Sequence, residues 1–178
     1  DLMSLDRVEG NERVRPTQRV VLNDIIQSTC HSLQPLALQA GVKFEFESPE
    51  LPVEIYGDSD QLTQVFTNII GNALKYGASG GRITLRMTTI AREAALRAPG
   101  VRLQVIDYGA GIDPVHLPRL TERFYRVDGH RSRELGGTGL GLAIVKHIIN
   151  RHRGKLNIKS ALGEGTTVTV MLPTEPLS

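Results

Sequence analysis

The sequence has a single cysteine, Cys30, among its 178 residues, which excludes an intrachain disulfide framework and a zinc site built from several cysteines. Neither sign of charge dominates, because 21 basic residues stand against 19 acidic ones and the formal net charge is +2. This balance offers no dedicated polyanion-binding surface, so we expect no nucleic-acid partner. No uncharged apolar run approaches the ~18 residues of a membrane span, and no signal peptide opens the chain.

Apolar residues make up 40% of the chain, which is enough to form a hydrophobic core and excludes wholesale disorder. Together with the absences above, this composition indicates a soluble, cytosolic domain. Because the chain opens at Asp1 without an initiator Met, we expect it to be a piece of a longer protein. Residues 1–17 hold apolar residues at helical spacing and Pro16, a pattern that predicts the last turns of a helix followed by a linker.

Hydrophobic periodicity predicts a single mixed domain over residues 18–175. The predicted strands are 19–22, 42–47, 53–56, 82–90, 101–107, 155–160 and 166–172. Three helices are predicted. The first is capped by Asn23 and ends at Gly41, and the second covers residues 59–76. The third is opened by residues 136–141 and ends at Gly154. Regular βαβ alternation is lacking, so we predict an α+β fold, a two-layer sandwich in which three main helices cover one face of a mixed, mostly antiparallel sheet.

The helix over 59–76 has a polar face that carries the first candidate site. This face is formed by Gln61, Gln64, Asn68, Asn72 and Lys75. It is open to two interpretations. A solvated face is one, although Glu and Lys are the usual choice there and asparagine is a poor helix former. In the other, the neutral oxygens of Asn68 and Asn72 ligate a hard cation and Lys75 contacts a phosphate.

A second candidate is the segment from Asp107 to Ile112, where a carboxylate at a strand end precedes Gly109 and Gly111. Glycines let the backbone approach a flat ligand edge, and an ionised carboxylate accepts hydrogen bonds, which suits an amino group such as that of adenine. An ordinary turn after a strand explains an isolated DxGxG pattern better. The roughly thirty residues that follow are long for a connector, and they predict a lid over about 112–137.

A third candidate is the run of four glycines within residues 136–141, which opens the last helix. Bare amides and the positive end of a helix make a cradle for phosphates. The run is no P-loop, because no Gly-Lys-Ser/Thr follows, and no Rossmann fingerprint, because no strand precedes it directly. A flexible hinge would explain Gly136 and Gly137 but not Gly139 and Gly141 in the first helical turn, so we favour phosphate binding.

Taken together and in this order, the segments resemble the ATP-binding catalytic domain of sensor histidine kinases, within the superfamily shared with DNA gyrase and mismatch-repair proteins. The resemblance covers about residues 19–173. Residues 68–76 (NIIGNALKY) resemble the asparagine box and 107–111 (DYGAG) the first glycine box. Residues 123–126 (RFYR) resemble the phenylalanine box, and 137–142 (GTGLGL) and 163–167 (GEGTT) the second and third glycine boxes. The segment FYRVD is most similar to kinases of the phosphate-regulon and osmosensor type.

The resemblance implies the Bergerat-type ATP-binding fold and a role for each matched residue. Asp107 would take the adenine amino group, with Gly109, Gly111, Ile112 and Thr166 nearby and Tyr76 against the ring. Asn72, with Asn68, would hold Mg²⁺, and Lys75 would contact a phosphate oxygen. Either Arg126 or the pair Arg131 and Arg133 would reach the γ-phosphate when the lid closes. The phosphate chain would lie on the amides of Gly137, Thr138, Gly139, Leu140, Gly141 and Leu142.

The resemblance also implies partners and an activity. The domain would bind Mg-ATP and donate the γ-phosphoryl group to a histidine on its own dimerisation domain, in a homodimeric protein that signals to a response regulator. Residues 1–17 would be the tail of the dimerisation helix and a linker, and any link to a bacterial inner membrane would come through missing N-terminal parts. The family's acceptor histidine precedes an acidic residue. The five histidines here precede Ser32, Leu117, Arg131, Ile148 and Arg153, so we interpret all five as structural or solvated.

Two alternatives stay open. A pseudokinase or an ATP-sensing interaction module would bind nucleotide without transferring a phosphoryl group. A gyrase-like ATPase would place a catalytic Glu where Asn68 stands, and the lack of a carboxylate there argues against efficient activation of water.

Overall fold

The computed structural model describes residues 15–112 and 141–175. In chain order the elements are β1 (Arg19–Val21), α2 (Leu22–Ala40), β2 (Lys43–Glu47), β3 (Glu54–Tyr56), α3 (Ser59–Tyr76), a short 3-10 helix (Ala78–Gly80), β4 (Arg82–Glu93), β5 (Ala98–Asp107), α5 (Gly141–Arg151), β6 (Lys155–Ala161) and β7 (Gly165–Pro173).

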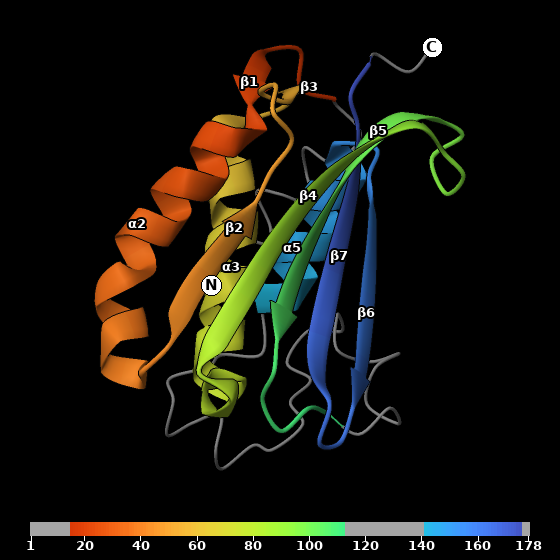
Figure 1. The fold of residues 1–178 in the computed structure, drawn as a ribbon. Coiled ribbons are helices and arrows are strands. Elements are labelled where there is room, and N and C mark those ends of the chain that lie inside the picture. Colours follow the sequence, from red (N-terminus) through yellow and green to blue (C-terminus); the bar gives the residue numbers. More distant parts are fainter. Residues whose placement is uncertain (1–14, 113–140, 176–178) are drawn as a thin grey trace.

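Five of the strands form one mixed sheet in the order β2-β4-β5-β7-β6 (Figure 1). β2 runs parallel to β4, and the other three pairings are antiparallel. β1 and β3 form a separate two-stranded antiparallel sheet. Because β5 lies at the centre, its last residue, Asp107, faces Ile83 of β4 on one side and Thr166 of β7 on the other. The register therefore places Asp107 at one end of the sheet between two neighbouring strands.

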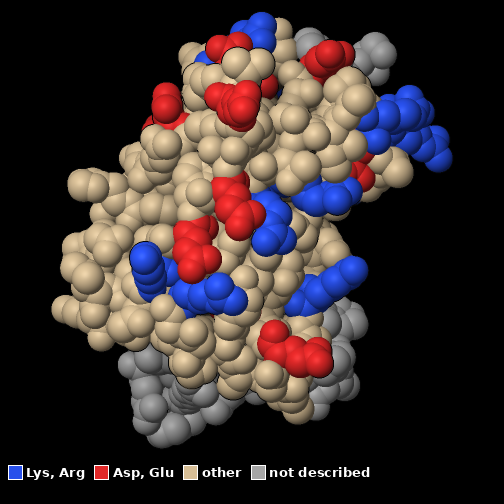
Figure 2. All heavy atoms as spheres, in the orientation of Figure 1, with Lys and Arg blue, Asp and Glu red and all other residues tan. Residues whose placement is uncertain are grey.

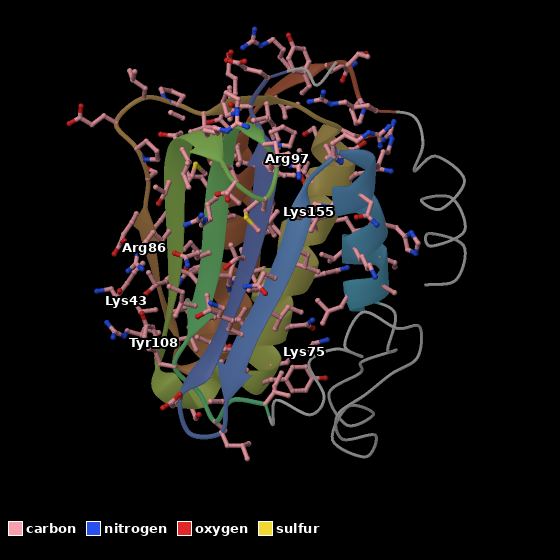
Figure 3. The ribbon with its side chains drawn as sticks, turned by 90° about the vertical axis from the view of Figure 1, so that its right-hand side faces the viewer. Lys43, Lys75, Arg86, Arg97, Tyr108 and Lys155 are labelled. Carbon is pink, nitrogen blue, oxygen red and sulfur yellow. The ribbon has the colours of Figure 1, made fainter. Side chains whose placement is uncertain are left out.

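The three helices cover one face of this sheet, as Figures 1 and 3 show. α3 contacts both α2 and α5. Its buried residues are Leu62, Val65, Phe66, Ile69, Ile70, Ala73 and Leu74, the apolar side of the helix that periodicity predicts. They pack against the inward side chains of β4, β5 and β7 in one continuous core. The predicted α+β sandwich is confirmed, with α3 at the bounds expected from the sequence.

The structure corrects two expectations about helix ends. The predicted cap at Asn23 is wrong, because α2 begins one residue earlier and Asn23 Oδ1 instead accepts a hydrogen bond from Val53 N at 2.7 Å. The predicted stop at Gly154 is also displaced. α5 ends at Arg151, and Arg153 takes the left-handed conformation with a φ of 60°. The hydrogen bond from Gly154 N to Ile149 O, at 2.9 Å, closes a Schellman-type end.

The face of the sheet away from the helices is polar and carries both signs of charge interspersed (Figure 2). Arg82 pairs with Glu45 at 3.7 Å and Arg86 with Glu47 at 2.7 Å, each joining β4 to β2. Within the described residues, no helix is long and apolar enough to cross a membrane.

Candidate functional site

Asp107 is the central group of the candidate site. Its side chain is buried, with the residue only 6% exposed. Oδ1 accepts hydrogen bonds from Gly109 N at 3.1 Å and Thr166 N at 3.2 Å. Burial raises the pKa of Asp107 above its ordinary value, and the two backbone N–H donors act in the opposite direction. Oδ2 has no hydrogen-bond partner among the described residues, so this oxygen is left to accept a hydrogen bond from a ligand.

Gly77, which follows α3 directly, packs against this carboxylate. A Cβ atom on Gly77 would collide with the Asp107 side chain, so only glycine permits this approach. A Cβ atom on Gly109 would likewise lie 2.6 Å from the Gly77 Cα atom. The C-terminal end of α3 and the turn after β5 are therefore in direct backbone contact, which brings the first two candidate motifs together.

Ser160 connects the third strand of the site, β6, to the same turn. Its Oγ accepts a hydrogen bond from Ile112 N at 2.7 Å and lies 2.7 Å from Thr166 Oγ1. The Ser160 hydroxyl can also donate to Gly165 O, at 2.9 Å. Sequence reasoning missed Ser160. The β6–β7 pairing was the available signal, because its register places Ser160 directly opposite Thr166.

The polar face of α3 approaches the first turn of α5. Asn68 and Asn72 are half-buried and Lys75 is exposed. Asn68 Nδ2 donates a long hydrogen bond, 3.4 Å, to the carbonyl oxygen of Gly141, the first residue of α5. Tyr76, the last residue of α3, is half-buried beside Gly77. Asn68 thus contacts the start of α5, whereas Lys75 and Tyr76 lie at the C-terminal end of α3, next to Gly77 and Asp107.

The structure describes some of the other predicted site residues but not all of them. Gly111 has a φ of 77° in the turn after β5, and Leu142 is half-buried in the first turn of α5. Arg126, Gly137, Thr138, Gly139 and Leu140 lie outside the described residues, as does the predicted lid beyond Ile112. Gln61 also belongs to the predicted polar face of α3, but it lies near the start of the helix, far from Asn72. Its Oε1 accepts a hydrogen bond from Arg151 Nη1 at 2.7 Å, so this part of the face contacts the end of α5.

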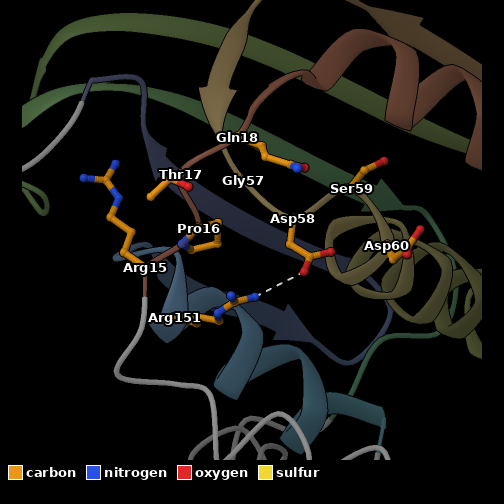
Figure 4. A pocket seen from close by; sticks show the side chains of 9 residues that line it. All are labelled: Arg15, Pro16, Thr17, Gln18, Gly57, Asp58, Ser59, Asp60 and Arg151. Atoms are coloured by element: carbon orange, nitrogen blue, oxygen red, sulfur yellow. Dashed lines mark hydrogen bonds and ion pairs between the residues drawn. The ribbon is translucent and has the colours of Figure 1, made fainter.

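That other end of α3 holds a cavity of about 460 Å³, shown in Figure 4. It is lined by Arg15, Pro16, Thr17, Gln18, Gly57, Asp58, Ser59, Asp60 and Arg151. α3 has 18 residues, and at 1.5 Å per residue its two ends lie roughly 27 Å apart. The cavity is therefore distant from Asp107, and its lining includes both acidic and basic side chains.

A buried histidine fastens α5 to α3 beside this cavity. His152 is 1% exposed, its Nε2 accepts a hydrogen bond from Asp58 N at 3.0 Å, and its Nδ1 lies 2.8 Å from Ile148 O. Arg151 Nη1 contacts Asp58 Oδ2 at 3.2 Å. Burial lowers the pKa of His152, so the neutral ring is favoured. His152 is therefore structural, as expected from the sequence.

The donor set at the Asp107 end fits a purine nucleotide with a hard cation. A buried carboxylate oxygen is left for an amino donor, and neutral amide oxygens and a lysine lie along α3. No cluster of three or more His, Cys, Asp or Glu side chains suited to a metal occurs among the described residues. A cation here would be held by asparagine oxygens together with its own phosphate ligands.

Comparison with known proteins decides the family. Residues 57–176 match the family described as histidine kinase-, DNA gyrase B- and HSP90-like ATPases. The chain belongs to this family. The matched range contains the polar face of α3, Asp107 and Thr166. ATP is the nucleotide that the family description implies.

Similar proteins are sensor kinases. The chain is 40% identical over 170 residues to the phosphate regulon sensor protein PhoR of Pseudomonas aeruginosa, which covers 95% of this chain and 36% of that protein. It is 42% identical over 132 residues to the sensor histidine kinase WalK of Bacillus subtilis, covering 74% of this chain and 21% of that protein. The chain thus spans little more than a third of the first of these relatives.

Among solved structures, the mycobacterial sensor histidine kinase MprB is similar with a TM-score of 0.73 and 28% identity, over 90% of this chain and 99% of that one. The sequence and structure matches agree that the chain is a catalytic domain of the type found in two-component sensor histidine kinases.

Proposed function

We propose that this chain binds Mg-ATP between the end of β5 and the polar face of α3, and donates the γ-phosphoryl group to a histidine of a separate dimerisation domain. The observation that carries this proposal is the state of Asp107, a buried carboxylate with Oδ1 held by two backbone N–H groups and Oδ2 left for a ligand. In a member of this ATPase family, an acceptor of this kind suits the amino group of adenine.

Each residue has a distinct part in the proposed site. Asp107 Oδ2 accepts from the adenine amino group, and Thr166 and Ile112, tied together by Ser160, form the adjoining wall. Tyr76 lies against the base. We assign the phosphate chain to the amides from Gly137 through Leu142, of which Gly141 and Leu142 begin α5.

Asn72 and Asn68 are the proposed ligands of Mg²⁺, and Lys75 and Arg126 the contacts of phosphate oxygens. When bound, Mg²⁺ supplies neutralisation of phosphate charge. The hydrogen bond from Asn68 Nδ2 to Gly141 O leaves Asn68 Oδ1 to face a ligand. Asn68 carries no carboxylate that would activate water, so the chain's residues favour transfer to a positioned acceptor over hydrolysis.

The partners follow from the same proposal. The acceptor histidine belongs to the dimerisation domain of the homodimeric parent protein, and the phosphoryl group then passes to a response regulator. Residues 1–17 are the proposed tail of the dimerisation helix and linker, and 18–175 the catalytic domain, with a lid over about 112–137. We assign this domain to the cytoplasmic side of a bacterial membrane sensor, on the example of its relatives.

Phosphoryl transfer is tested by incubating the purified 178-residue chain with γ-labelled ATP and Mg²⁺, with and without a separately purified dimerisation domain that carries the acceptor histidine. We expect acid-labile label on the dimerisation domain only. The Asp107→Asn variant, at the same ATP concentration, is the control and should give far less label.

Two results would contradict the proposal. Acid-labile label on the isolated chain would show that one of its own five histidines accepts the phosphoryl group. No label on the dimerisation domain, with ATP binding measured in the same sample, would favour the pseudokinase instead.

A further inference from the structure

Tyr108 follows Asp107 directly, yet the two side chains lie on opposite faces of the sheet, as successive residues of a strand do. Asp107 points toward the helices and the proposed adenine site. Figure 3 shows Tyr108 with Lys43 and Arg86 on the opposite side of the sheet from Lys75 and α5. Tyr108 therefore cannot touch the nucleotide, although one peptide bond joins it to the residue that does.

Two contacts hold the Tyr108 side chain on that open face. The Arg82 guanidinium lies over its ring, with Cζ 4.1 Å from the ring centroid. Its hydroxyl oxygen is 3.0 Å from Thr84 Oγ1, and Thr84 is 2% exposed. Glu45 of β2 supports both neighbours, because it pairs with Arg82 at 3.7 Å and accepts from Thr84 Oγ1 at 3.4 Å.

The backbone of Tyr108 is confined as well. A Cβ atom on Gly80 would collide with the Tyr108 carbonyl oxygen, so the 3-10 helix after α3 packs tightly on this peptide. The hydrogen bond from Gly109 N to Asp107 Oδ1 spans Tyr108 and closes the turn around it. The ring contacts, the packing of Gly80 against the Tyr108 carbonyl and the hydrogen bond from Gly109 N to Asp107 Oδ1 together restrict the turn that carries the Asp107 carboxylate.

We propose that Tyr108 is a positioning residue that fixes the Asp107 carboxylate for the adenine amino group; this inference rests on the proposed function. Burying the ionised carboxylate is unfavourable, so a loosened turn would let it move toward water. The contacts among Tyr108, Arg82 and Thr84 oppose this movement from the far side of the sheet. Tyr108 thereby sets base preference without touching the base.

The test compares ATP with inosine triphosphate, which has a carbonyl oxygen in place of the adenine amino group, so its C6 substituent cannot donate a hydrogen bond to Asp107. Calorimetry at a temperature well below the melting point gives both dissociation constants for each variant. We expect Tyr108→Ala to weaken ATP binding about tenfold and to leave inosine triphosphate within about twofold. Tyr108→Phe keeps the ring under Arg82 and should recover most of the ATP affinity.

Two single variants, at Arg82 and Arg86, keep the test valid even if Tyr108→Ala does not fold. Arg82→Ala removes the guanidinium above the ring and should reduce the preference for ATP in the same direction. Arg86→Ala removes an exposed pair on the same face and should leave both constants unchanged. In an Asp107→Asn background, Tyr108→Ala should cause little further loss, because both changes remove one interaction.

An equal loss of affinity for both nucleotides, an unchanged ATP constant, or additive losses in the double variant would each overturn the proposal and leave the proposed function standing. A wild-type chain that does not prefer ATP over inosine triphosphate would overturn both.

Discussion

At the scale of single residues, the proposed adenine site depends on a carboxylate that is buried at some energetic cost. Burial raises the pKa of Asp107, so its ionised form is less stable in the folded chain than in water. The two N–H donors to Oδ1 offset part of this cost. A ligand donor to Oδ2 would offset more of it, which is why such a group serves recognition better than stability.

Asp107→Asn should therefore keep the fold and lose the nucleotide. Asparagine Oδ1 can still accept from Gly109 N and Thr166 N, and the substitution removes the buried charge, so the melting temperature at pH 7 should be unchanged or higher. Its amide would present a donor to the adenine amino donor, which costs about 1.5–3 kcal/mol, or roughly ten- to a hundredfold in ATP affinity. Calorimetry and thermal melting measure the two effects separately. Unchanged affinity in a folded variant would remove Asp107 from the site.

Asn72→Ala should abolish the tightening of ATP binding by Mg²⁺ and affect Mg-free nucleotide much less. Its neutral oxygen suits a hard cation that keeps most of its water. ATP titrations in Mg²⁺ and in a chelator give the two dissociation constants whose ratio measures the effect of Mg²⁺. Gln64→Ala, on the same helix but nearer its start, is the matched control. If Asn72→Ala retains the full Mg²⁺ effect, Asn68 becomes the principal ligand candidate.

The sequence singled out Asp107 and Asn72 as candidates because a carboxylate at a strand end and an asparagine within a helix are uncommon, and the resemblance to sensor histidine kinases gave them their predicted roles. It did not identify Ser160 or Tyr108. A serine in a strand and a tyrosine in a turn are ordinary. The partner of Ser160 follows from the register of the β6–β7 hairpin, whereas the partners of Tyr108 depend on how β4 pairs with β5.

At the scale of elements, α5 is fastened at both ends. Its first residue meets Asn68, and its last turn is joined to the start of α3 through His152 and Arg151. Contacts at both ends of α5 thus position its first turn, the proposed phosphate-binding end, against α3. The periodicity of α3 predicted both of its bounds, whereas the start of α2 depended on a tertiary hydrogen bond from Val53 that local capping rules do not include.

His152 should make this attachment sensitive to acid. Burial lowers its pKa below the ordinary 6.5, and Asp58, Arg151 and Arg15 are the charged groups that act on it. The folded chain then binds fewer protons than the unfolded chain below pH 6.5, so stability is unaffected above that pH and falls as the pH decreases toward the folded pKa. Protonation also removes the acceptor for Asp58 N.

Melting temperatures between pH 8 and pH 5 test this expectation for the wild type and His152→Gln. The variant should be less stable at pH 8 but lose less on acidification. His31→Gln, at an exposed histidine, should keep the wild-type slope. Identical slopes for wild type and His152→Gln would show that His152 does not titrate with unfolding.

At the scale of the whole molecule, the candidate site lies toward one end of the sandwich. The end of β5, the end of α3 and the start of β7 meet there, and the start of α5 contacts α3 at Asn68, whereas the cavity beside Asp58 lies at the other end. Sequence patterns predicted the layers and the ordered motifs. They could not predict the strand order β2-β4-β5-β7-β6 or the parallel β2–β4 pair, because strand order depends on long-range pairing rather than on local periodicity.

Amide chemical shifts of the labelled chain, mapped during titration with Mg-ATP, show whether ATP binds at the Asp107 end. We expect the largest shifts in residues 68–76, 107–112 and 160–166, little change in 15–18 and 57–60, and loss of these shifts in Asp107→Asn at the same ATP concentration. Shifts concentrated in residues 15–18 and 57–60, with 107–112 unchanged, would instead place the nucleotide in the distant cavity.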